Sequence, residues 1–65
     1  MKLYELNDKR VVTKAVPGVI YQMAMKVVEK TTGKEYVVSL LDAFCMDKTK
    51  YVAISDGVSY HLNIA

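Results

Sequence analysis

Cys45 and His61 are the one pair of residues that could act as a nucleophile and its base. A thiol that gives its proton to an imidazole becomes a reactive thiolate. Such a site also needs a group that orients the base and donors for an oxyanion, and no motif around either residue supplies them. The sequence therefore favours a buried structural thiol and a half-exposed strand histidine, and it predicts that the protein is not an enzyme.

Metal and cofactor sites are not expected either. A structural zinc site needs four ligands, whereas Cys45 and His61 are the only cysteine and histidine. Asp42 and Asp47 do not have the alternate spacing of acids that precedes the glycine of a calcium loop. The three glycines fall in separate predicted turns and form no phosphate-binding cluster. They are Gly18, Gly33 and Gly57.

Two groups of residues are candidates for binding another protein. Met23 and Met25 share one face of a predicted strand with Tyr21, and methionine adapts to irregular partner surfaces. The same side chains could equally be ordinary core. Asp42 lies among apolar neighbours and could anchor an interface, although a helix-cap or solvent-facing position is favoured.

The five tyrosines raise the possibility of nucleic-acid binding, because small β-barrels stack bases on such rings. They are Tyr4, Tyr21, Tyr36, Tyr51 and Tyr60. A net charge of only +2 with a single arginine is a weak electrostatic basis for binding phosphates. Core packing of the rings is therefore the favoured interpretation.

Length and composition favour an association with another chain. The sequence has 65 residues, enough for one domain, and a domain this short buries only about 60% of its unfolded surface. Apolar residues make up 52% of it, and one cysteine cannot form a disulfide within the chain. We therefore expect a homo-oligomer, a dimer above all, or a tight complex with another protein. An unpaired cysteine and the absence of a signal or membrane segment favour the cytoplasm and no membrane partner.

The C-terminal region carries the strongest turn signal. Asp56-Gly57 lies between two strand-like runs, 50–55 and 58–65, and such a pair is typical of a two-residue β-hairpin. This hairpin would pair Ala53 with Tyr60. It would also place Tyr51, Ala53, Val58, Tyr60, Leu62 and Ile64 on one face.

A second hairpin is predicted around Thr32-Gly33. A two-residue loop would place Lys30 opposite Glu35 and Tyr21 opposite Phe44. A three-residue loop with a left-handed Gly33 is the alternative, and it would set two glutamates against each other. The first register is favoured for that reason.

The region 39–48 fits either a continuing strand or a short helix. Ser39 followed by Asp42 resembles a capping box, but a short apolar run cannot be assigned from periodicity, and a strand is slightly favoured. Two further strands are expected over 3–6 and 11–16, with Pro17 between strands. The predicted fold is all-β, or mainly β with one helical turn near 40–48. Its five or six strands would form a small up-and-down barrel or a curled antiparallel sheet.

The sequence thus favours a protein-interaction module that works through a sheet face or an edge strand. By class analogy it could be an inhibitor or adaptor, like the small inhibitors that phages encode. A nucleic-acid-binding barrel and an oligomer that binds a small ligand are the alternatives. The candidate binding residues are Tyr21, Met23, Met25, Asp42, Phe44, Tyr60 and His61.

Overall fold

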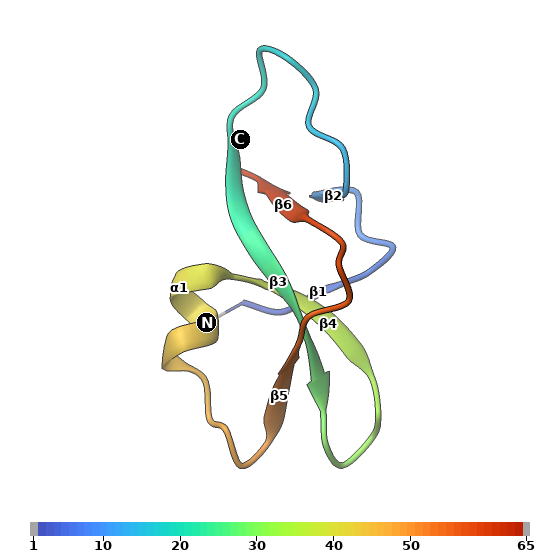
Figure 1. The fold of residues 1–65 in the computed structure, drawn as a ribbon, viewed down its shortest axis with the longest axis vertical. Coiled ribbons are helices and arrows are strands. Elements are labelled where there is room, and N and C mark those ends of the chain that lie inside the picture. Colours follow the sequence, from blue (N-terminus) through green and yellow to red (C-terminus); the bar gives the residue numbers. More distant parts are fainter. Residues whose placement is uncertain (1, 65) are drawn as a thin grey trace.

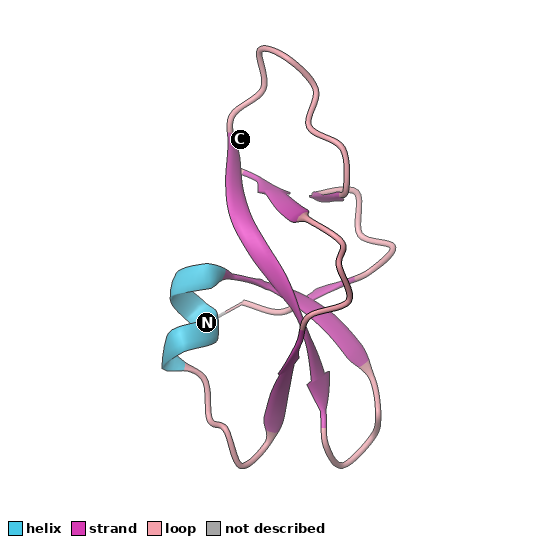
Figure 2. Ribbon diagram, in the orientation of Figure 1, coloured by secondary structure: helices cyan, strands magenta, loops and turns pink. Residues whose placement is uncertain are grey.

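The computed structural model describes residues 2–64 as a mainly β fold with one short helix (Figures 1 and 2). The elements in chain order are β1 (Tyr4–Glu5), β2 (Val11–Val12), β3 (Tyr21–Glu29), β4 (Glu35–Ser39), α1 (Leu40–Cys45), β5 (Tyr51–Ile54) and β6 (Tyr60–Asn63). The predicted fold class, including a short helix within 40–48, is confirmed.

The sheet is organised around β3, and every strand pair in it is antiparallel. β4 lies along one edge of β3, while β5 and β6 follow each other along the other edge. β1 then pairs with the outer edge of β4, and β2 with the outer edge of β6. The result is a curled, nearly closed sheet in which the long β3 is the common partner (Figure 1).

The C-terminal hairpin prediction was wrong. β5 and β6 do not pair with each other, because Ile54 lies opposite Lys26 and Tyr60 lies opposite Ala24. In a continuous strand, one residue between Ile54 and Tyr60 would lie opposite Met25. Residues 55–59 occupy this place instead and form a bulge. Gly57 has the expected positive φ of 78°, but Asp56 does not, so the two-residue hairpin turn is not formed.

This correction also redistributes the side chains that the hairpin would have placed together. Tyr51 packs in the cluster of Val27 and Val38, whereas Tyr60 and Leu62 pack in the other core cluster. Successive side chains of a strand point to opposite faces of the sheet, so the register of a strand decides which face each side chain occupies. Each of β5 and β6 takes its register from β3 and not from the other.

The β3–β4 hairpin forms, but in neither of the registers considered. Val28 lies opposite Glu35, and the Glu29 N–H donates to the Lys34 carbonyl. The loop is therefore longer, and it closes through the Gly33 N–H, which donates to the Glu29 carbonyl over 2.8 Å. The register differs by two residues from the favoured one, so each side chain keeps its predicted face while its partner changes.

The region after β4 is a helix, so the strand preference for 39–48 was wrong and the capping-box alternative holds. The Ser39 hydroxyl accepts a hydrogen bond from the Asp42 N–H over 3.2 Å, which satisfies a free donor of the first helical turn. The N-terminal strands are shorter than predicted and pair with β4 and β6. Pro17 lies between β2 and β3, as expected.

Both faces of the sheet carry a small core. One cluster contains Val27, Val38 and Met46 on the face that α1 covers, which we call the helix side. The other contains Ala24, Val37, Tyr60 and Leu62 on the opposite side. Val27, Val37 and Val38 are completely buried, so burial is concentrated where β4 crosses the middle of β3.

Candidate functional site

Four of the seven predicted binding residues lie on the helix side of the sheet. Tyr21, Met23 and Met25 alternate along β3, and His61 of β6 lies directly opposite Met23. The Tyr21 and His61 rings are 6.1 Å apart with an interplanar angle of 59°. Met25 is half-buried and packs against the Val27 cluster together with Ala43 of α1, so it serves the core.

Tyr60 does not belong to this group. Its ring is buried in the core on the opposite side of the sheet, where it packs with Ala24 and Leu62. Its hydroxyl donates to the Asp56 carboxylate over 2.9 Å. Tyr60 was a candidate binding residue, but its ring is used in the core and is not presented on the helix side.

Large apolar side chains are exposed on β3 and on α1. Met23 is 63% exposed, Leu41 is 71% exposed and Phe44 is 79% exposed. α1 begins directly after Ser39, which lies opposite Ala24 of β3. Leu41 and Phe44 are three residues apart, so they share one side of the helix. We call Tyr21, Met23, Leu41, Phe44 and His61 the apolar face.

Leu41 is the member of the apolar face that the sequence prediction missed. It would have been found by reading 39–48 as a helix, because the i, i+3 spacing then groups it with Phe44. Asp42 was a candidate interface anchor, although a helix-cap or solvent-facing position was favoured, and it is half-buried in the first turn of α1. An acid in the first turn is favourable near the positive end of the helix dipole, which accounts for Asp42 without a partner.

Cys45 is exposed at the end of α1, so the expectation of a buried thiol was wrong. His61 is half-exposed, as predicted for a strand histidine, and its ring lies near that of Tyr21. Within residues 2–64, no group of three or more His, Cys, Asp and Glu side chains could hold a metal ion.

A charged cluster on the opposite side of the sheet was not anticipated from the sequence. The Lys26 ammonium lies 2.8 Å from the Glu35 carboxylate and 3.2 Å from that of Asp56. The Tyr60 hydroxyl and the Val58 N–H also donate to Asp56. No signal could have revealed this cluster, because it depends on the unpredicted bulge at 55–59.

The same contacts shift the proton affinities of the cluster. Hydrogen bonds to Glu35 and Asp56 raise the pKa of Lys26 above its ordinary value. The Val58 N–H, followed by the Tyr60 hydroxyl and Lys26, lowers the pKa of Asp56. Burial and the bond to Asp56 raise the pKa of Tyr60. The cluster thus holds Lys26 and Asp56 charged and Tyr60 neutral, and it fastens the bulge to β3.

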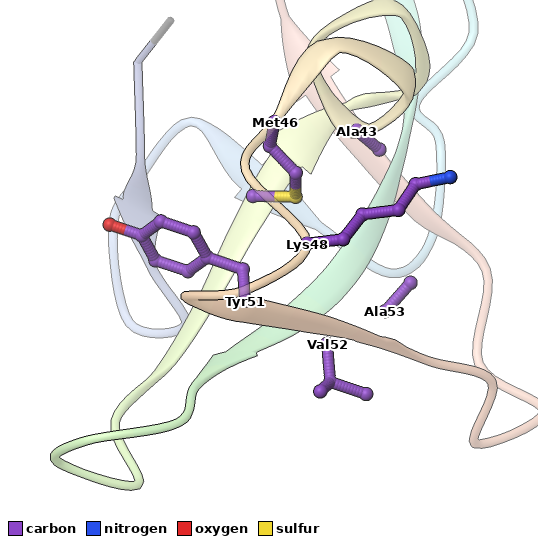
Figure 3. A pocket seen from close by; sticks show the side chains of 6 residues that line it. All are labelled: Ala43, Met46, Lys48, Tyr51, Val52 and Ala53. Carbon is purple, nitrogen blue, oxygen red and sulfur yellow. The ribbon is translucent and has the colours of Figure 1, made fainter.

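A groove lies between α1 and β5. It has a volume of about 270 Å³ and is lined by Ala43, Met46, Lys48, Tyr51, Val52 and Ala53. Figure 3 shows the Lys48 side chain between the side chains of Ala43 and Ala53. Of the described residues that line this groove, Lys48 alone is charged.

A second hollow lies at the end of the molecule that carries the loop between β2 and β3. It has a volume of about 390 Å³ and is lined by Gly18, Val19, Ile20 and Ile64. Ile20 and Ile64 are 73% and 59% exposed. This surface is apolar, but no charged or polar side chain in its lining would give it chemical selectivity.

Comparisons with protein-family models, with curated proteins and with solved structures gave no match to this chain. Among the described residues, no helix is both long enough and apolar enough to cross a bilayer. Any proposal about function therefore depends on the surfaces described above.

Proposed function

We propose that the protein is a protein-interaction module of the cytoplasm that binds another protein chain through its apolar face, acting as an inhibitor or adaptor. The single observation that supports this proposal is the exposure of Met23 on the helix side of β3 and of Leu41 and Phe44 on α1, the helix that covers this side. Exposed apolar side chains that gather on one surface are typical of protein-binding sites. Methionine and aromatic residues are also enriched at such interfaces.

The composition of the apolar face supports a protein partner over a nucleic acid. Tyr21 and His61 present half-buried rings at its edge, and Tyr60 is buried in the core. The rings are therefore used mainly for packing, whereas single-stranded nucleic acids need exposed rings beside a row of cations. A second copy of the chain is one possible partner, in keeping with the expected dimer.

Affinity purification from the source cells tests the proposal. The tagged wild-type protein is compared with a Leu41→Lys/Phe44→Lys variant and with Val16→Lys, in which a 56% exposed side chain of the β2–β3 loop changes in the same way. We expect one or more proteins to be recovered with the wild type and with Val16→Lys, and to be lost with the double variant. Equal recovery with all three proteins would contradict the proposed binding surface.

A further inference from the structure

Among the residues that the structure describes, no strand lies beside the outer edge of β5. Within residues 2–64, β5 pairs with β3 alone, whereas β6 is covered by β2 on its other edge. An unpaired strand edge offers a row of backbone donors and acceptors to another extended chain. Such an edge is a known way of capturing a peptide.

The ladder between β3 and β5 shows which backbone groups are available. The Lys30 N–H donates to the Lys50 carbonyl over 2.8 Å. Because alternate residues of an antiparallel strand bond to the same neighbour, Val52 and Ile54 direct their backbone groups toward β3. Tyr51 and Ala53 direct theirs outward. The Tyr51 N–H already donates to the Asp47 carbonyl. The Tyr51 carbonyl and both backbone groups of Ala53 therefore remain available to a bound peptide.

The groove beside β5 adds side-chain selectivity to this edge. The side chains that line it are apolar apart from the Lys48 ammonium and the Tyr51 hydroxyl. Both ion pairs of the described chain are made by Lys26 and not by Lys48. The nearest acid in sequence, Asp47, accepts hydrogen bonds from the N–H and hydroxyl of Thr49. A chain lying along β5 could therefore place an apolar side chain in the groove and a carboxylate near the Lys48 ammonium.

We propose that β5 and its groove bind an extended, acidic segment of a partner protein, which adds to the sheet as a further strand. The segment would carry an apolar side chain flanked by Asp or Glu. It would exchange hydrogen bonds with the backbone of Ala53. This site shares no residue with the apolar face, so it stands or falls independently of the proposed function.

A random peptide library displayed on phage provides the probe. The library is selected on the wild-type protein, and enriched peptides are synthesised and titrated while the backbone amide signals are followed by NMR. We expect Asp and Glu to exceed Lys and Arg in the enriched peptides relative to the starting library. We also expect the Ala53 amide to be among the signals that shift most. An absence of enrichment, or shifts confined to the apolar face, would overturn the proposal.

Three changes separate edge addition from other modes of binding. Ala53→Pro removes the outward N–H without removing a bond to β3, and proline is tolerated at such edge positions. It should weaken binding about tenfold. Lys48→Glu should weaken binding of the acidic peptides about fivefold, whereas Lys14→Glu should not. Lys14 belongs to the loop between β2 and β3, and this loop is at the end of the molecule opposite β5 (Figure 1).

N-methylation of the peptide keeps the test valid if Ala53→Pro does not fold. Methyl groups on alternate backbone nitrogens should abolish binding in one phase and spare it in the other, because only every second amide faces β5. Equal binding of the two methylated peptide series would contradict strand addition at this site. Equal binding of the acidic peptides by Lys48→Glu and by the wild type would also contradict it.

Discussion

At the scale of single residues, the Lys26 cluster is the clearest example of side chains that fix the fold. Lys26 joins two carboxylates that are far apart in sequence, Glu35 of β4 and Asp56 of the bulge. The Val58 N–H closes a local turn on Asp56. The cluster therefore holds the 55–59 bulge against β3, at the point where β5 ends and β6 has not yet begun.

The Asp56 carboxylate should make the stability of the fold sensitive to acid. Its pKa is lowered in the folded protein, so its contribution is present above the unfolded pKa of about 4 and is lost as the pH falls through the folded value. The pKa of Lys26 is raised from 10.5, so its contribution is complete below that pH and is lost only as the pH rises through the folded value. Both contributions are complete at neutral pH.

An Asp56→Asn variant tests this assignment. It should be less stable than the wild type at pH 7, and the difference should shrink as the pH falls from 5 to about 2, because only the wild type then loses the charge. Thermal unfolding of both proteins across this pH range gives the measurement. Two unfolding curves that stay the same distance apart at every pH would show that Asp56 is not the group responsible.

At the scale of elements, some local signals in the sequence were confirmed, whereas the predicted strand pairing was not. Gly33 and Gly57 adopt the positive φ that their turns predicted, and Ser39 caps a helix. The partners of β5 and β6 could not be inferred in this way. With nine residues, β3 is long enough to pair with β5 and then with β6 along the same edge. Turn signals between neighbouring segments do not indicate such a shared partner.

The residues of the candidate site were likewise predicted only in part. Tyr21 and Met23 were assigned to one face correctly, because alternation along a single strand does not depend on its partners. Tyr60, also a candidate binding residue, is buried on the opposite side, because its neighbour His61 takes the position opposite Met23. The groove between α1 and β5 could not be foreseen at all, since it requires both the helix and the observed position of β5.

The Ser39 cap should be important for α1. The Ser39 side chain is buried and its hydroxyl accepts the Asp42 N–H. Ser39→Ala should therefore lower the free energy of unfolding by about 1 kcal/mol. Urea denaturation measures this change, with Ser59→Ala in the exposed bulge as the control. A loss no larger than that of the control would mean that the cap does not stabilise the helix.

At the scale of the whole molecule, the notable feature is how little of the apolar content is buried. Two clusters share the core between the two sides of the sheet, while Phe44, Leu41 and Ile20 are each more than 70% exposed. A chain of this size has few means of gaining further stability by itself. Burial of the apolar face against another chain would supply what the small core does not.

Sedimentation velocity on the purified protein tests whether a second copy provides this burial. We expect a concentration-dependent dimer, and we expect Leu41→Lys/Phe44→Lys to shift the equilibrium to the monomer, because two introduced charges would be desolvated in the interface. Val16→Lys should leave the dimer unchanged. A dimer that persists in the double variant would place the self-association surface elsewhere.

Site-specific photo-crosslinking in the source cells tests the central claim most directly. A photoreactive phenylalanine derivative replaces Phe44 in one protein and Val16 in another, and the crosslinked products are identified by mass spectrometry. The proposed apolar face predicts a discrete crosslinked partner, or a crosslinked dimer, from position 44 and not from position 16. No crosslink from position 44, or the same products from both positions, would contradict protein binding through this face.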